Sequence, residues 1–393
     1  MKITEFTLFI VLFFAFSNSL SAQIDVKKEF EFAAKQYEGM VAAHPDVTQF
    51  PQSSKSDGAP DNRKADWWCS GFFGGSLWYI FEYNKQQTWK DAAHKWTMAV
   101  ENQQFNKGTH DLGFMLYCPF GNGYRLTQNE AYKNVMLTGA KSLATRFDPS
   151  VGVIKSWDKF EKIYDYPVII DNMMNLEFLF WAAKTSGDKS LYNICTTHAD
   201  NTLKNHFRPD NSSFHVICYA PDGKVLAKKT HQGYADGSAW SRGQAWGMYG
   251  YATVYRETRD KKYLKQAIKI ADFILNRPNL PADKIPYWDF NAPSIPNEER
   301  DVSAAAVTAS GLLELQGYVK GKKRKIYFAA AKKMLESLSS GDYKAKLDEN
   351  NHFILMHSVG SKPHKSEVNT PLVYADYYYL EALLRYDALM RKK

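Results

Sequence analysis

The chain has 393 residues, of which 45% are hydrophobic and 23% are charged, and its formal net charge is +8. This composition excludes a disordered, collagen-like or coiled-coil protein and provides enough apolar residues for a sizeable core. Aromatic residues make up 15% of the chain, which fits an aromatic core and a sugar-binding protein equally well. The one short basic cluster, residues 322–325, lies at a predicted helix start, and no nucleic-acid-binding module is recognised. We therefore expect no nucleic-acid partner.

Residues 1–22 have the layout of a secretory signal peptide. Lys2 supplies the positive charge, residues 6–16 form an apolar run too short to span a bilayer, and cleavage is expected after Ala22. Cleavage after Ser21 and retention as an uncleaved anchor are the alternatives. We expect a mature protein of residues 23–393 that has no membrane attachment after cleavage.

About twelve helices are predicted in chain order, and mostly apolar or small residues recur at steps of 4, 8 and 11 in five of them, starting at Trp89, Tyr132, Leu191, Tyr263 and Tyr327. These steps keep one apolar stripe along each helix. The predicted helices are residues 26–44, 72–84, 88–105, 111–117, 128–147, 172–186, 189–206, 241–257, 261–277, 302–319, 323–339 and 374–390.

Strand-like stretches are few, namely residues 214–219 and 353–357. Helices that alternate with a repeat of roughly 40–70 residues predict a closed helical ring. We therefore expect an all-α fold, an (α/α)6 barrel of six inner and six outer helices, in a single domain over residues 23–393. The segments ahead of the striped helices are richer in Trp, Gly, Asp and His, which predicts that they form the inner ring and the pocket.

Two further segments bear on function. Residues 279–296 are proline-rich but contain Tyr287, Trp288 and Phe290, which favours a loop over a pocket. The chain has no Walker, Rossmann, HExxH or GxSxG signature and no His/Cys cluster with metal-ligand spacing, so we expect neither a cofactor nor a metal. The cysteines are far apart, which predicts free thiols without a disulfide scaffold; they are Cys69, Cys118, Cys195 and Cys218.

Asp111 and Asp171 each precede a helical apolar pattern. An Asp at such a position commonly caps the helix by accepting backbone N–H bonds. Alternatively, both carboxylates face the barrel mouth and divide acid and base roles, with the more buried one protonated near neutral pH. The two interpretations are compatible, and spacing alone does not choose between them.

Residues 231–246 hold two Trp, two Gln, one Arg, one His and three Gly ahead of a helix, a mixture for which a core helix has no use. A guanidinium recognises carboxylates, and Trp offers a stacking face, so this stretch predicts a binding wall. Residues 66–75 combine aromatic faces with glycines in the same way. His110 and His215 are weaker candidates, because a lone His is more often a hydrogen-bonded core residue.

On these residues the chain resembles glycoside hydrolase family 88, the unsaturated glucuronyl hydrolases. The stretches that carry the resemblance run in order from about residue 60 to residue 390, and they are residues 68–72, 110–114, 171–175, 233–246, 300–306 and 374–378. The resemblance implies an (α/α)6 barrel that removes a 4,5-unsaturated uronic acid from lyase-generated oligosaccharides. It also implies hydration of the C4=C5 enol ether, with a carboxylic acid that protonates C4 while water adds at C5.

The resemblance assigns the acid/base role to Asp171 and the second essential carboxylate to Asp111. It implies substrate-binding roles for a further set of residues, Trp68, His110, His215, Gln232, Arg242 and Trp246. A sulfate-contacting segment falls on Ser358, Ser361 and Lys362, with Lys362 one residue out of register. The implied substrate is an unsaturated oligosaccharide from a glycosaminoglycan (chondroitin, hyaluronan or heparin type), with or without sulfate. Together with the signal peptide, this predicts a periplasmic enzyme of a Gram-negative bacterium, as a monomer or weak dimer.

Three alternatives remain open. An unsaturated rhamnogalacturonyl hydrolase would use the same fold and chemistry on pectin fragments. An ordinary inverting glycosidase would use one carboxylate as acid and the other as base. A non-catalytic oligosaccharide-binding protein would keep Arg242 and Trp246 but would need neither Asp111 nor Asp171.

Overall fold

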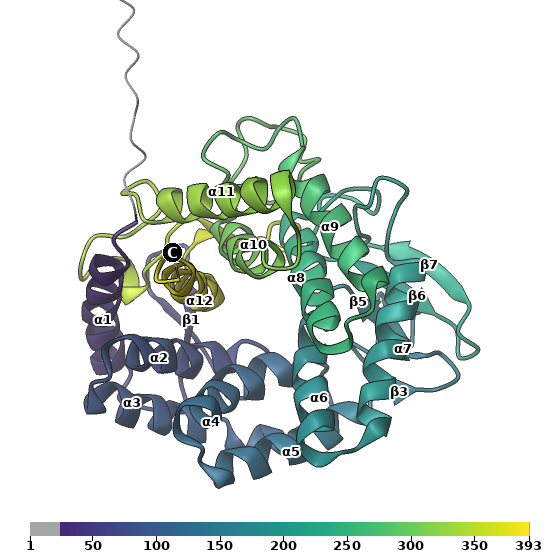
Figure 1. Cartoon of the computed structure of the whole chain (residues 1–393), viewed down its shortest axis with the longest axis horizontal. Helices are drawn as coiled ribbons and strands as arrows, with labels where there is room; N and C mark the ends of the chain where they lie inside the picture. The colour runs from purple at the N-terminus through teal and green to yellow at the C-terminus, as the bar shows by residue number, and fades with distance from the viewer. Residues whose placement is uncertain (1–23, 393) are drawn as a thin grey trace, which may run out of the picture.

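The structure, a computed structural model, describes residues 24–392. Six helical segments form an inner ring in which each packs against the next and α12 packs against α2, which closes the ring (Figure 1). They are α2 (Ser70–Asn84), the π-helix η2 (Gly113–Gly121) running into α4 (Asn122–Thr127), α6 (Asn172–Ser186), α8 (Ser241–Thr258), α10 (Val302–Leu315) and α12 (Val373–Met390).

An outer helix covers each inner segment. The outer helices are α1 (Val26–Ala43), α3 (Gln87–Met98), α5 (Glu130–Ala144), α7 (Lys189–Asn205), α9 (Lys261–Leu275) and α11 (Gly321–Leu338). In Figure 1 the chain runs once around the ring, so that α1 and α12, the first and last helices, lie close to each other. The predicted (α/α)6 barrel is confirmed.

Burial separates the two rings as the sequence pattern predicts. In α9 the buried residues form one stripe, which includes Tyr263, Ala267, Ile270 and Ile274. In α10 every residue from Val302 to Leu313 is buried, because an inner helix has ring neighbours on both sides and an outer helix behind it.

Three predicted elements differ from the structure. The helix predicted at 88–105 ends at Met98, and the 3-10 helix η1 (Glu101–Phe105) follows it. The helix predicted at 111–117 instead runs from Gly113 through α4. The strand predicted at 353–357 is wrong: this segment follows the 3-10 helix η3 (Asn350–His352) as irregular chain, because the Asp376 carboxylate takes the backbone N–H groups of Ile354 and Leu355.

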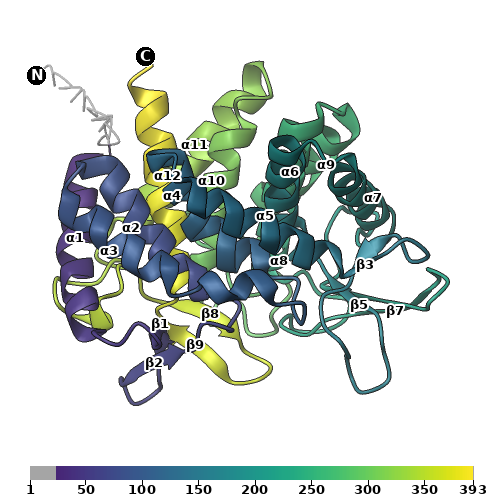
Figure 2. The ribbon, with the colours of Figure 1, turned by 90° about the horizontal axis from the view of Figure 1, so that it is seen from below.

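The strands form four small antiparallel sheets along one side of the ring (Figure 2). They pair β1 (Phe50–Ser54) with β2 (Pro60–Arg63), β3 (Phe147–Asp148) with β4 (Val153–Ile154), β5 (Pro167–Ile169) with β6 (Val216–Tyr219) and β7 (Val225–Lys229), and β8 (Ser358–Ser361) with β9 (Ser366–Thr370). The strand predicted at 214–219 is confirmed as β6. Several strands lie just ahead of inner helices in the chain, so the segments leading into the barrel meet on this side.

All four cysteines are buried and free, as predicted. Within residues 24–392 no helix combines the length and the apolar character needed to cross a bilayer. The predicted signal peptide, residues 1–22, lies outside the described residues.

Candidate active site

Two carboxylates stand at the starts of neighbouring inner helices, on the side of the ring that carries the strands. Asp171 occupies the N-cap position of α6, yet its side chain makes no capping hydrogen bond. Asp111 lies two residues before η2, whose N-cap is Leu112. The capping interpretation is therefore wrong for both side chains. Both carboxylates instead line the same cavity.

Close packing of η2 on α6 brings the two carboxylates together. A Cβ on Gly113 would lie 2.5 Å from Asn175 Oδ1 and 2.8 Å from its Cα, so only glycine allows this approach. Asn175 Oδ1 accepts a hydrogen bond of 3.2 Å from the Phe114 backbone N–H. The π-helical turn that follows Asp111 thus fixes this residue against the helix that follows Asp171.

The environment keeps the Asp171 carboxyl group protonated at higher pH than an ordinary carboxyl group. Burial raises its pKa to about 7; Arg242 opposes this rise, and the nearby charge of Asp111 adds to it. A hydrogen bond from Trp246 lowers the pKa slightly. Asp111 accepts a 2.9 Å hydrogen bond from the Thr109 hydroxyl. The two carboxyl groups thus have different surroundings, which is the arrangement that separates an acid from its partner.

His215 reaches Asp171 through strand pairing. β5 pairs with β6, and the Ile170 N–H donates to the His215 carbonyl oxygen at 3.0 Å. The His215 Nδ1 accepts backbone N–H bonds of 3.1 Å from both His231 and Gln232, so the ring proton is on Nε2. That Nε2 lies 3.6 Å from Asp171 Oδ2. Burial lowers the pKa of His215, so this ring is a neutral donor that faces the carboxyl group.

His110 stands behind the other carboxylate in a similar way. Its Nε2 lies 3.3 Å from Asp111 Oδ1, and its side chain is fully buried. Burial lowers the pKa of His110 more than the charge of Asp111 raises it. Each candidate carboxylate is therefore backed by a buried imidazole.

The cavity that holds both carboxylates has a volume of about 290 Å³. Its wall combines aromatic rings, three carboxylates and a group of hydrogen-bonding side chains. Aromatic faces with a few convergent polar groups are typical of a small-molecule site. The lining residues are Trp67, Trp68, Trp157, Tyr374, Asp111, Asp171, Glu367, His231, Gln232, Arg242, Ser361, His364, Ser366, Ile169 and Gly360.

Arg242 forms the inner end of this wall and also binds the β8–β9 hairpin to the barrel. Its side chain is 1% exposed and pairs with the fully buried Asp301 at 2.9 Å. The guanidinium donates to the carbonyl oxygens of Val359 and Gly360, the latter at 2.7 Å. Gln232 donates to the same Gly360 carbonyl at 3.1 Å. Much of the hydrogen-bonding capacity of Arg242 is thus used inside the protein.

The structure divides the predicted site residues into three groups. On the cavity wall lie Asp111, Asp171, Trp68, Gln232, Arg242 and Ser361. Directly behind the carboxylates lie His110, His215 and Trp246. Away from the cavity lie Ser358 and Lys362.

Three of these predictions need correction. Trp246 offers no stacking face, because it is 0% exposed and packs against Phe114 and Tyr378. Ser358 is fully buried in β8. The Lys362 ammonium forms ion pairs with Glu298, at 2.5 Å, and with Glu299, and neither carboxylate lines the cavity.

The predicted loop 279–296 contributes no residue to the cavity. It instead supports the binding stretch from outside. Asp289 Oδ2 accepts the Tyr234 N–H at 3.0 Å and the Ser238 hydroxyl at 2.6 Å. Trp240 pairs with Asp289 through an isolated bridge.

Nine of the fifteen lining residues were not among the predicted site residues. His231 and Tyr374 stand inside or next to the singled-out stretches, so their position was a usable signal. Trp157, His364 and Glu367 come from irregular or hairpin segments without a periodic pattern, and only the fold brings them to the cavity.

A model of the Glycosyl Hydrolase Family 88 matches residues 40–389. An unsaturated glucuronyl hydrolase of Formosa agariphila is 48% identical over 327 residues, which cover 83% of this chain and 81% of that protein. The crystal structure of an unsaturated glucuronyl hydrolase specific for heparin has a TM-score of 0.90 and 46% identity, covering 93% of this chain and 98% of that one. A Streptococcus agalactiae unsaturated glucuronyl hydrolase mutant complexed with dGlcA-GalNAc6S has a TM-score of 0.80 and 29% identity, covering 93% of this chain and 92% of that one.

Proposed function

This chain belongs to glycoside hydrolase family 88, and we propose that it removes the 4,5-unsaturated uronic acid from the non-reducing end of lyase-generated glycosaminoglycan oligosaccharides. It is a glycosidase. One observation carries the residue assignment: Asp171, a buried carboxyl whose pKa is raised to about 7, lies beside Asp111 in an aromatic-walled cavity. A group that must give a proton to carbon near neutral pH needs this kind of environment.

In the proposed reaction the Asp171 carboxyl group gives its proton to C4 of the substrate. Water adds its oxygen to C5, and the carboxylate left on Asp171 takes the remaining proton from that water. The C4=C5 bond is consumed, and C5 becomes a hemiketal carbon. The hemiketal opens to a C5 ketone, and the next sugar is released from C1. Atoms balance with one water consumed, and Asp171 returns to its protonated form.

The neighbours of Asp171 support both of its protonation states. The Nε2–H of His215 faces Asp171 Oδ2 at 3.6 Å, so it can stabilise the carboxylate that forms after proton transfer. Because His215 stays neutral, it does so without pulling the pKa of Asp171 down to the usual carboxyl range. Burial raises that pKa, the charge of Asp111 adds to the rise, and we assign to Asp111 the orientation of the attacking water.

Positive charge in the cavity comes from Arg242, whose guanidinium is held by Asp301 and by β8. We propose that the substrate carboxylate lies near this guanidinium and Gln232, and that the sugar rings lie against Trp68 and Trp157. The solved relative that is specific for heparin is 46% identical, whereas the one complexed with dGlcA-GalNAc6S is 29% identical. We therefore propose heparin-type disaccharides as the preferred substrates and chondroitin-type ones as secondary substrates.

Ultraviolet absorbance tests the proposal directly, because hydration destroys the conjugated double bond. Lyase-generated disaccharides from heparin, chondroitin, hyaluronan and pectin would be incubated with the wild type, Asp171→Asn and the control Asp165→Asn, whose side chain is 81% exposed. We expect decay with the glycosaminoglycan products, fastest for heparin, and a loss of about 10²- to 10⁴-fold in Asp171→Asn only.

The other outcomes separate the alternatives. Decay only with the pectin product would identify a rhamnogalacturonyl hydrolase. Release of the partner sugar ahead of the loss of absorbance would indicate ordinary hydrolysis at C1, because the freed unsaturated sugar loses its double bond only afterwards, when its ring opens and the enol becomes the C5 ketone. Binding without any release would indicate a non-catalytic sugar-binding protein.

We also propose export to the periplasm, directed by residues 1–22, and a monomer or weak dimer in solution. N-terminal sequencing of the protein from a periplasmic fraction should begin at Gln23, and light scattering should give the mass of one chain at low concentration. A protein that retains Met1, or a dimer that persists on dilution, would contradict these proposals.

A further inference from the structure

A second cavity opens at the other end of the barrel, where the inner helices α2, α6, α8 and α12 approach their C-termini. Its volume is about 600 Å³, which is within the range of about 300–1,000 Å³ for small-molecule sites. The side chain of Phe114 separates it from the active site: this residue lines the second cavity, and its ring lies 5.7 Å from that of Trp68. The reaction proposed above uses no residue of this cavity.

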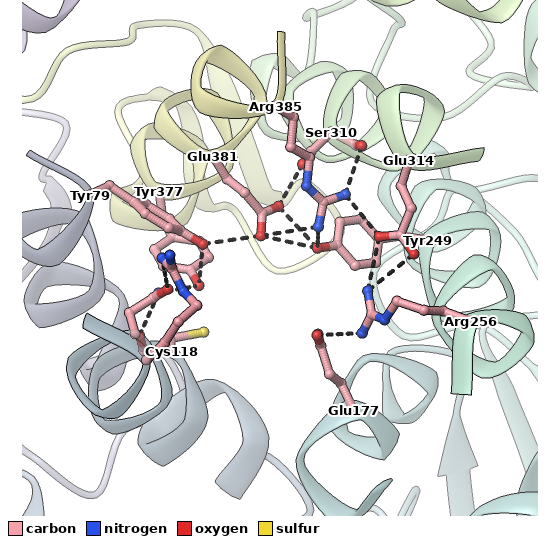
Figure 3. Close-up of polar contacts among 12 residues, drawn as sticks. Tyr79, Cys118, Glu177, Tyr249, Arg256, Ser310, Glu314, Tyr377, Glu381 and Arg385 are labelled. Carbon is pink, nitrogen blue, oxygen red and sulfur yellow. Dashed lines mark hydrogen bonds and ion pairs between the residues drawn. The ribbon is translucent and has the colours of Figure 1, made fainter. Parts of the chain in front are cut away.

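Charged side chains in and around this cavity neutralise one another. Glu82 accepts a 2.7 Å hydrogen bond from Arg125. Glu177 pairs with Arg256 at 2.5 Å. Figure 3 shows Glu177 and Arg256, with Glu381 and Arg385, pointing from several helices toward one shared space.

Glu381 is the most heavily bonded carboxylate of the set (Figure 3). It pairs with Arg385 at 3.4 Å and accepts hydrogen bonds from Tyr79 at 3.0 Å and Ser310 at 2.5 Å. Tyr249 donates to both of its oxygens. This carboxylate has little capacity left for a ligand.

The balance of charge excludes strongly charged ligands. Three carboxylates line the cavity and each is paired with an arginine, so an anionic ligand would find none of these guanidinium groups without a partner. A cationic ligand would find no carboxylate without a partner, because Glu82, Glu177 and Glu381 each have an arginine. Displacing such a partner would leave a charge uncompensated.

Aromatic rings form another part of the wall. Trp181, Tyr117 and Tyr124 are partly exposed and line the cavity. The ring of Trp181 lies 6.1 Å from that of Tyr117 and 6.0 Å from that of Tyr124. Glu177 precedes Trp181 by one helical turn on α6, so a carboxylate and an indole share one face.

From this lining we propose that the second cavity binds an uncharged pyranose sugar, with its ring against Trp181 and its hydroxyl groups bonded to Glu177 and Arg125. An aromatic face packs on the C–H face of a sugar ring, while ionised side chains make the strongest hydrogen bonds to hydroxyl groups. A purely apolar ligand would remove water from these charged groups without offering them a hydrogen bond in return.

Three sugars with the same ring but different charge test the proposal. Glucose, glucuronate and glucosamine would be titrated into the full chain by calorimetry and saturation-transfer NMR. Binding would be compared in the wild type, Trp181→Ala, Glu177→Gln, the active-site variant Trp157→Ala and the surface control Tyr192→Ala, which removes a ring 38% exposed on α7.

We expect glucose to bind in the millimolar range and the two charged sugars to bind at least several-fold more weakly. Trp181→Ala should weaken glucose binding by about tenfold, and Glu177→Gln should weaken it by less. Trp157→Ala and Tyr192→Ala should leave it unchanged. Because the second cavity takes no part in the proposed reaction, Trp181→Ala should keep the wild-type kcat/KM for disaccharide hydration. Unchanged kcat/KM would also show that this variant is folded.

Several results would overturn the inference. Glucose binding that survives Trp181→Ala and Glu177→Gln, or that is lost in Trp157→Ala, would place the sugar elsewhere or in the active site. Tighter binding of glucuronate or glucosamine than of glucose would contradict the charge argument. Absence of glucose binding to the wild type would dismiss the site.

Discussion

Replacing Asp171 by Asn should remove activity and yet stabilise the folded chain at neutral and alkaline pH. Burial raises the pKa of Asp171 from 3.8 to about 7, so between these values the folded state binds more protons at this site than the unfolded state. The free energy of unfolding of the wild type therefore decreases as pH rises from about 4 to about 7, because the folded state must ionise this buried group. Asn has no such penalty at any pH.

The size of the effect follows from the shift. A shift of about 3 pKa units corresponds to a destabilisation of the folded wild type by about 4 kcal/mol. The full destabilisation is reached only above pH 7, and almost none of it is present at pH 4. Solvent in the cavity reduces this figure, so we expect about 1 to 4 kcal/mol. For a chain of this length, 1 kcal/mol moves Tm by about 1 to 2 °C. The Tm of Asp171→Asn relative to wild type should thus rise by about 1 to 8 °C between pH 4 and pH 8.

Thermal melts of both proteins across this pH range give the measurement. Asp376, whose pKa is also raised to about 7 by burial, is present in both proteins, so its contribution cancels in the difference. The exposed control Asp165→Asn should follow the wild type at every pH. A Tm difference that stays constant, or that shrinks as pH rises, would refute the conclusion that burial keeps Asp171 protonated.

Four further outcomes are expected. The kcat/KM for disaccharide hydration should fall about tenfold per pH unit above about pH 7, because proton transfer needs the protonated form of Asp171; a flat profile to pH 9 would exclude it as the acid. Arg242→Ala should lower the free energy of unfolding by about 3 to 5 kcal/mol in denaturant melts, because it leaves Asp301 buried without a partner; a loss below about 1 kcal/mol would contradict this. Lys362→Ala should change the ratio of kcat/KM for sulfated and unsulfated disaccharides by less than about twofold, since Glu298 and its neighbour hold the ammonium; a larger change would return Lys362 to the site. All four buried thiols should react with a thiol reagent only as fast as the chain unfolds, whereas immediate labelling of the native protein would contradict their burial.

The helical periodicity made most of the fold predictable. A stripe such as Tyr263, Ala267, Ile270 and Ile274 needs only local spacing to be recognised, because every helix with one covered face must repeat at about 3.6 residues. Element boundaries were less accurate. The long segment predicted at 88–105 breaks after Met98, and the π-helix after Asp111 has no local signature.

The candidate carboxylates were predictable for a similar reason. Asp111 and Asp171 precede inner helices, and in a closed ring the starts of neighbouring helices meet at one mouth. The sequence could not separate a capping role from a catalytic one. A capping role requires the side chain to turn back to its own helix, and the absence of a capping hydrogen bond excludes that role for Asp171, whose catalytic role stays a prediction.

The amino-acid sequence by itself determined the helical ring, the free cysteines and the two carboxylates, because each depends on residue type and short-range spacing. Only the tertiary structure decided which side chains share the cavity. Glu367 and His364 reach it through the β8–β9 hairpin, and His215 reaches Asp171 through the pairing of β5 with β6. Lys362 points instead to Glu298 and Glu299, and Trp246 is buried behind Asp171. These placements join residues far apart in the chain, and the raised pKa of Asp171 arises from burial, which no local pattern records.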